Sequence, residues 1–228
     1  MRSFFGFAVL LILSLVAAMV WGEAFMDDFE REDDDELGND WNTQADGTIT
    51  VEIVDKEVLI SGSQGIDWQR SGLSRTIEEE TKIYFDFLAN DNFNVHIRID
   101  DTGSGAYIDT YAWPSGPFSF ASSVDGGWPG WTQIAGSNMM PGQYNTLGIE
   151  QNEDGDFEVY LNDRKVNTIE NENLRNISKV LIASDAAAGT AGSLHIDNVI
   201  IGDPDVVPPK VVEPASKLAT SWGRLKEL

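Results

Sequence analysis

The 228-residue chain contains no cysteine and only two histidines, His96 and His195. Without a thiol, the chain cannot form a disulfide scaffold, a thiol nucleophile or a thiolate metal site. The spacing between the two histidines matches no metal-binding motif. An apolar core must therefore provide most of the stability, and a chain of this size can bury roughly 70% of its unfolded surface.

Basic residues are scarce. The 15 Lys and Arg are outnumbered by 38 Asp and Glu, which gives a formal net charge of −23 and a pI near 4.1. Such a surface repels polyanions, which argues against nucleic acid and against an anionic membrane surface as partners. The hydrophobic fraction of 42% is that of a globular domain and is too high for a disordered acidic chain.

The first 24 residues have the pattern of a secretory signal peptide. Met1-Arg2-Ser3 is followed by an apolar run from Phe4 to Val20, and Gly22-Glu23-Ala24 places small residues at the cleavage position. The alternative is an uncleaved anchor, since about 18 apolar residues can just span a bilayer. Because the run is short and acidic residues follow it, we expect cleavage and no membrane insertion afterwards. The protein is then secreted, at the cell surface or in the periplasm.

Alternation of apolar and polar residues is the dominant pattern in the rest of the chain. It covers Thr48–Ile53, Thr81–Phe87, Phe93–Asp100 and Phe157–Leu161, and turn residues such as Asn90-Asp91-Asn92 separate these segments. Two further runs, 179–183 and 194–201, are rich in β-branched residues. Many short strands with regular turns predict an all-β, two-sheet antiparallel jelly-roll sandwich over residues 25–204.

The last segment, residues 205–228, differs from the predicted sandwich. It begins as a proline-rich linker and ends with Leu218, Trp222 and Leu225 at helical spacing. We expect this tail to lie outside the sandwich and to serve in sorting, anchoring or binding a cell-surface partner. The alternative is a frayed terminus without a role.

Three segments together resemble concanavalin A-like, laminin G-like jelly-roll domains of secreted bacterial proteins. They are the opening segment 25–41, the hairpin 143–166 and the closing segment 193–202, although Asp163 stands where glycine is usual in the hairpin turn. The resemblance implies two curved antiparallel sheets. It also implies a superfamily that includes both carbohydrate-binding modules and glycoside hydrolases, so that the fold does not settle the function.

The sequence assigns no catalytic residue. Retaining glucanases of the superfamily that the chain resembles carry E-x-D-x-E on one strand, where alternate residues share a face. Residues 52–57, Glu-Ile-Val-Asp-Lys-Glu, miss this spacing because Glu52 points to the opposite face, and the run also fits two strand ends around a turn. A lyase that uses His96 and Arg98 beside Tyr107 or Tyr111 remains an alternative. Solvated histidines on a polar sheet face are the simpler interpretation.

An aromatic segment, residues 111–131, is interrupted by glycine and proline. Flat aromatic rings in such a loop suit stacking on sugar rings, with nearby polar groups accepting hydrogen bonds from hydroxyls. The alternative is that Phe118 and Phe120 belong to the core while the tryptophans plug the sandwich edge. The candidates for carbohydrate binding are Tyr111, Trp113, Asp125, Trp128 and Trp131, with His96 and Arg98 beside them and Trp68 as an additional candidate.

Carboxylates near both ends of the predicted sandwich suggest a metal site. Asp27, Asp28 and Glu30 would lie near Asp197 if the first and last strands pair, and carboxylate oxygens suit Ca²⁺. We therefore expect a structural calcium held by Asp28, Glu30 and Asp197, the alternative being solvated charges.

Three functions remain open. The leading interpretation is a secreted, non-catalytic module that binds a polysaccharide or another extracellular polymer. The second is a polysaccharide-degrading lyase or hydrolase that uses the His96 and Arg98 face. The third is a structural or adhesion protein of the cell surface.

Overall fold

The computed structural model describes residues 24–78, 80–114, 116–175 and 177–202. Within these ranges every regular element is a β-strand, and no helix is present that could cross a bilayer. The predicted signal peptide up to residue 23 and the predicted tail from residue 205 lie outside the described residues.

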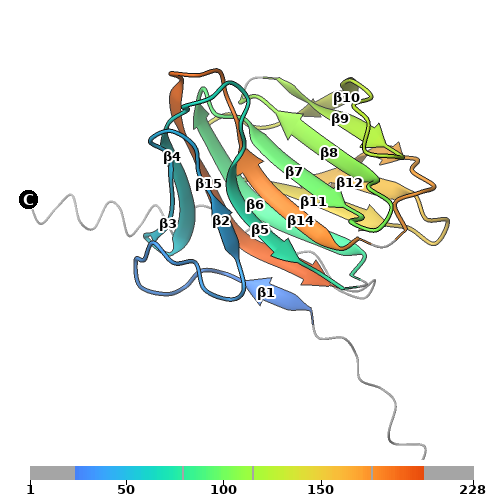
Figure 1. The fold of residues 1–228 in the computed structure, drawn as a ribbon, viewed down its shortest axis with the longest axis horizontal. Coiled ribbons are helices and arrows are strands. Elements are labelled where there is room, and N and C mark those ends of the chain that lie inside the picture. The colour runs from blue at the N-terminus through green and yellow to red at the C-terminus, as the bar shows by residue number, and fades with distance from the viewer. Residues whose placement is uncertain (1–23, 79, 115, 176, 203–228) are drawn as a thin grey trace, which may run out of the picture.

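The strands form two antiparallel sheets, here called sheet A and sheet B (Figure 1). Sheet A runs in the order β13 (Arg164–Ile169), β12 (Phe157–Leu161), β11 (Asn145–Gln151), β6 (Lys82–Asp91), β15 (Ala191–Gly202), β4 (Glu57–Ser63) and β3 (Thr50–Val54), and β1 (Phe25–Asp27) also pairs with β15. Sheet B runs in the order β10 (Thr132–Asn138), β9 (Pro117–Ser123), β8 (Tyr107–Ala112), β7 (Val95–Asp100), β14 (Lys179–Ser184), β5 (Ser71–Thr76) and β2 (Asn42–Gln44). This confirms the all-β jelly-roll sandwich that the sequence predicts.

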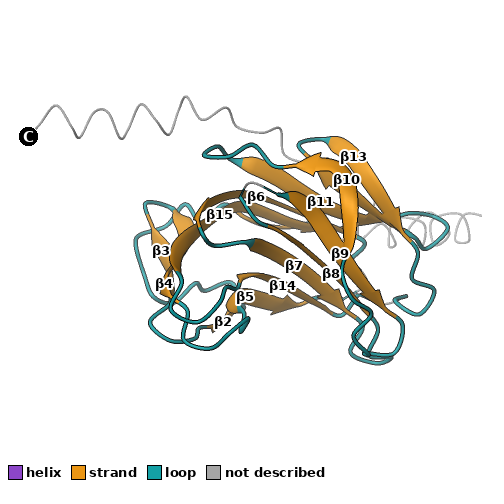
Figure 2. Cartoon of the chain, turned by 90° about the horizontal axis from the view of Figure 1, so that it is seen from above, coloured by secondary structure: helices purple, strands orange, loops and turns teal. Residues whose placement is uncertain are grey.

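The two sheets pack face to face, as the view from above shows (Figure 2). Alternate residues of each strand point between the sheets, so the period of two in the sequence becomes one shared apolar core. Phe87 on β6 and Phe118 on β9 meet across the two sheets with their rings edge to face, 6.2 Å apart. Phe118 is fully buried and Phe120 packs against the core, as the structural interpretation of the aromatic segment predicted.

Tight turns set the register of the hairpins. Asp55 and Lys56 both have positive φ angles, of 52° and 69°, and so do Asn162 and Asp163, of 51° and 61°. Two consecutive left-handed residues make the turn whose twist matches that of paired strands. The turn at Asp55 separates Glu52 on β3 from Glu57 on β4, so residues 52–57 form the two strand ends and turn that the sequence suggested.

Candidate functional site

The outer face of sheet B carries the polar residues of its two middle strands. On β7, Ile97 and Ile99 point into the core, so His96, Arg98 and Asp100 point outward. Cross-strand pairing with β8 places three outward residues directly opposite: His96 pairs with Tyr111, Arg98 with Asp109, and Asp100 with Tyr107. The register therefore gathers the charged and aromatic residues of both strands on one face.

His96 and Asp109 from these strands form an ionic cluster with two loop residues, Arg70 and Asp185; the four residues are here called the His96 cluster. The imidazole lies between two carboxylates, with Nδ1 3.3 Å from Asp109 and Nε2 3.1 Å from Asp185. Nε2 and Asp185 are close enough for an electrostatic interaction, but the angle at the Nε2 hydrogen is too bent for a hydrogen bond. The Arg70 guanidinium forms an ion pair with Asp109. Asn94 donates its side-chain amide to Asp185 at 2.6 Å and accepts the Asp185 backbone N–H at 2.8 Å.

The cluster shifts the ionisation of its members. Burial disfavours a charged imidazole, but the hydrogen bond with Asp109 and the negative charges of Asp109 and Asp185 outweigh burial and raise the pKa of His96. Burial likewise acts to raise the pKa of Asp185, and contacts with His96 and Asn94, together with the charge of Arg70, bring it below its usual value. The arrangement therefore favours a protonated His96 between two carboxylates.

The prediction that His96 is a solvated residue is wrong, because its side chain is only 2% exposed, and its assignment to carbohydrate binding stays a prediction. Asp185 and the rings of Tyr111 and Trp131 bury the imidazole. In the β4–β5 connection, the Trp68 backbone N–H donates to the Ala186 carbonyl at 2.8 Å, and Gln64 accepts the N–H of Gly189 at 2.8 Å. Both imidazole nitrogens already face carboxylates, so neither is placed to take a proton from a substrate.

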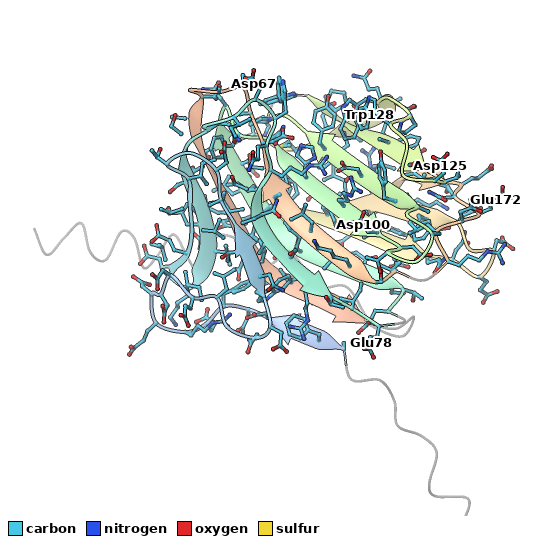
Figure 3. All side chains as sticks on the ribbon, viewed as in Figure 1. Asp67, Glu78, Asp100, Asp125, Trp128 and Glu172 are labelled. Atoms are coloured by element: carbon cyan, nitrogen blue, oxygen red, sulfur yellow. The ribbon has the colours of Figure 1, made fainter. Side chains whose placement is uncertain are left out.

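Above the buried histidine lies a stack of aromatic rings, here called the aromatic stack: Tyr111, Trp128 and Trp131. The Tyr111 ring is stacked on the His96 ring, with 5.4 Å between centroids. Trp131 packs on Tyr111 at 4.3 Å, and Trp128 meets Trp131 edge to face at 5.0 Å. Trp128, labelled in Figure 3, is 61% exposed. Trp131 is 37% exposed, so both rings are accessible to solvent.

The other aromatic candidates differ in their surroundings. Trp113 is half-buried against the core, which favours the structural interpretation for this residue. Trp68 meets the Trp113 ring edge to face at 6.1 Å, yet Trp68 is itself 56% exposed. Asp125 is exposed and accepts the Gly127 backbone N–H at 3.0 Å, so it shapes the loop that carries Trp128.

A pocket of about 550 Å³ opens beside these residues. Arg98 lies in its lining, where the guanidinium contacts Asp100 at 2.6 Å and lies over the Tyr107 ring at 3.9 Å. The volume is in the range of about 300–1,000 Å³ that is typical of ligand pockets. Its lining consists of Gln44, Trp68, Arg70, Arg98, Asp100, Asp101, Thr102, Gly105, Lys179 and Leu181.

Several residues of this site were not among the sequence candidates, notably Arg70, Lys179 and Asp185. Each comes from a segment that carries no recognisable motif. Strand pairing brings Lys179 opposite Asp100, and loop packing brings Arg70 and Asp185 over β7 and β8. These contacts could be predicted from the sequence only if the strand order were already known.

The first and last strands pair as expected, since β1 runs antiparallel to β15 with Asp27 opposite Val199. The expected calcium ligands do not form one group, however. Across the described ranges, no three His, Asp or Glu residues are arranged so that they could hold a metal ion. Glu30 pairs with Lys56 at 2.5 Å, and the Asp197 carboxylate accepts the amide of Asn198. Calcium binding stays a prediction.

Asp27, next to these residues, is buried in a network of side-chain donors. Arg31 forms a two-point ion pair with it, and Asn39 and the Trp41 indole donate to it at 3.1 and 2.9 Å. Burial acts to raise the pKa of Asp27, and these donors, together with the Phe29 N–H, bring it below its usual value. The network fixes the opening segment to the sandwich.

No family model and no curated protein sequence matches the chain. Among solved structures it is similar to a sialidase, with a TM-score of 0.60 and 16% identity over 80% of this chain, although it spans only 18% of the sialidase. It is also similar to a Bacillus licheniformis β-glucanase, with a TM-score of 0.59 and 11% identity over 80% of this chain and 99% of that one.

A prokaryotic β-1,3-1,4-glucanase derived from a mouse hindgut metagenome gives a TM-score of 0.58 and 8% identity over 78% of this chain and 98% of that one. At such identities the likeness shows the fold alone. The laminin G-like subdivision of the resemblance stays a prediction. The described chain therefore has the concanavalin A-like jelly-roll fold that these glucanases share.

Proposed function

We propose that the outer face of sheet B binds a polysaccharide without cleaving it. The observation that carries this proposal is the aromatic stack. Trp131 packs on Tyr111, Trp128 packs on Trp131, and both tryptophan rings remain exposed. A large aromatic side chain buried in the core contributes to stability, whereas one left in water does not. Exposed, pre-positioned rings suit contact with the apolar faces of sugars, and the neighbouring pocket supplies polar partners for hydroxyls.

The ionic pairing of the site supports binding rather than hydrolysis. A retaining or inverting glycosidase needs one carboxylic acid that keeps its proton, which requires a raised pKa. Here Asp109 and Asp185 are both paired with His96, and Asp185 has a lowered pKa. Asp100 is paired with Arg98. A lowered pKa favours the charged form of Asp185, which has no proton to donate to a leaving group.

The similar glucanases share the fold, and they are named for their action on β-glucans. Together with the aromatic stack, this supports a polysaccharide as the partner. Secretion, or display at the cell surface or in the periplasm, fits the signal-peptide pattern of the first 24 residues.

Affinity gel electrophoresis against a panel of soluble polysaccharides tests the proposal. Retention of the Trp128→Ala and Trp131→Ala variants should fall about tenfold or more. Truncating an aromatic side chain that becomes buried when the ligand binds reduces the binding free energy by roughly 2 kcal/mol or more. The matched control is Met26→Ala, another exposed apolar side chain, which lies on β1 of sheet A. Equal retention of the tryptophan variants and the wild type would overturn the proposed site. Release of new reducing ends from a retained polymer would overturn the non-catalytic role.

A further inference from the structure

We infer that the pocket beside the aromatic stack binds one carboxylate-bearing sugar residue, such as a uronic acid within an otherwise neutral polysaccharide. The inference rests on the proposed function and specifies its ligand. Its starting point is the distribution of charge. Three of the 15 basic residues in a chain of net charge −23 line this single pocket: Arg70, Arg98 and Lys179.

The two arginines are held in fixed positions. Arg70 pairs with the buried Asp109. Arg98 uses Nε and Nη2 to contact one Asp100 oxygen, at 2.7 and 2.6 Å, and lies over the Tyr107 ring. Its Nη1 group has no hydrogen-bond partner among the described residues. A guanidinium that is already positioned loses little conformational entropy when it donates a further hydrogen bond to a ligand carboxylate.

Lys179 is the basic residue of the pocket that forms no ion pair among the described residues, whereas Arg70 and Arg98 are each paired with an aspartate. It begins β14 directly opposite Asp100, and it is half-buried. In the part of the chain that the structure describes, no carboxylate lies within ion-pairing distance of its ammonium group. Asp101, which also lines the pocket, directs one carboxylate oxygen to the backbone N–H groups of Gly103 and Ser104. The pocket is therefore a local exception to the acidity of the chain.

The acidity of the chain as a whole limits the charge density of the ligand. Exposed charges interact weakly beyond about 10 Å at 0.1 M salt, so one carboxylate in the pocket mainly senses the charges that line it, three basic residues against two carboxylates. A polymer with a charge on every residue would extend beyond the pocket and be repelled by a protein whose net charge is −23. This balance favours isolated acidic sugars over a uniformly charged polyanion.

Trp68 provides a surface for the sugar ring itself. It lines the same pocket, is 56% exposed and has a φ angle of 60°. A bulky residue in this left-handed region is strained, and such strain gathers at functional sites. The Trp68 backbone N–H is fixed by the Ala186 carbonyl, so the loop holds the ring at the pocket edge.

The test uses glucuronoxylan, a neutral chain with occasional glucuronic acid branches, and the same polymer after reduction of its carboxylates to alcohols. Wild type should be retained about tenfold more strongly by the acidic form, because a charge-assisted hydrogen bond contributes roughly 1.5–3 kcal/mol. Lys179→Gln should lose most of this preference and Lys179→Arg should keep it. The control Lys165→Gln, in a residue paired with Glu158 on sheet A, should behave as wild type. The melting temperature of each variant should be measured to check that the variant is folded.

The possible failures are distinguishable. Equal retention of both forms, lost in Trp131→Ala, would overturn the carboxylate preference and leave the polysaccharide site standing. A preference that survives in Lys179→Gln would place the carboxylate elsewhere and overturn the assignment to this pocket. If neither form is retained, and no other polymer of the panel is, both the inference and the proposed function fail.

Discussion

Replacement of His96 by Gln should destabilise the domain substantially. The substitution keeps a polar side chain but removes the positive charge between Asp109 and Asp185. Arg70 still pairs with Asp109, so Asp185 is the carboxylate that loses its cation. Removing one partner of a buried ion pair costs about 3–5 kcal/mol, and the remaining Asn94 hydrogen bond places the expectation near 3 kcal/mol.

The assay is urea unfolding of the protein, followed by circular dichroism and supported by thermal melts. For a domain of about 150–250 residues, 1 kcal/mol corresponds to roughly 2–4 °C, so the melting temperature should fall by about 6–12 °C. His195→Gln is the matched control, because His195 lies at the partly exposed outer face of sheet A and contacts Glu57 at 2.8 Å. His195→Gln should lower the free energy of unfolding by less than His96→Gln does. A His96→Gln variant within 1 kcal/mol of wild type would refute the reasoning.

The same cluster predicts the direction of the pH dependence. The pKa of His96 is raised in the folded protein, so its contribution is fully present below the unfolded value of about 6.5 and is lost as pH rises through the folded value. The pKa of Asp185 is lowered, so its contribution is lost as pH falls below about 3.9. Wild type should therefore lose stability above about pH 6.5 relative to His96→Gln. A constant difference between the two proteins from pH 5 to 9 would contradict this assignment.

Two further substitutions test other parts of the fold. Asp27→Asn should lower the free energy of unfolding by about 2–4 kcal/mol at pH 7, since it leaves Arg31 without its buried partner. This loss should shrink as the pH falls below about 3.9, because Asp27 has a lowered pKa in the folded protein. Urea titrations at several pH values measure both effects. Gly148→Ala should destabilise by about 1–3 kcal/mol, because the new methyl group would overlap the packed Tyr84 ring, whereas Gly116→Ala has room and should change the melting temperature little. A Gly148→Ala protein that melts with wild type would show that the Tyr84 ring moves freely.

The strands could be predicted because their pattern is local. Alternation at Val95–Asp100 identifies the inward face without knowledge of any partner, and the turn residues around Asp55 and Asp163 mark hairpins. The fold class follows from the number and spacing of such segments. Each of these inferences uses residues that are close together in the sequence.

The site required contacts between distant residues. Alternation shows that His96 points outward, but it does not show that Asp185 and the rings of Tyr111 and Trp131 bury it. Asp185 lies about 90 residues further along the chain and reaches His96 only because β14 pairs with β7. The exposed tryptophans, in contrast, could be predicted because glycine and proline interrupt their segment.

The most direct test of the central claim follows the indole N–H signals of the tryptophans by NMR, assigned with Trp→Phe variants, as a retained oligosaccharide is added. Trp128 and Trp131 are exposed in the aromatic stack, whereas Trp41 is buried and donates its indole N–H to Asp27 at 2.9 Å. Polysaccharide binding at the outer face of sheet B predicts that the Trp128 and Trp131 signals shift with a common dissociation constant while the Trp41 signal stays unchanged. Binding that leaves the Trp128 and Trp131 signals unmoved would contradict the account.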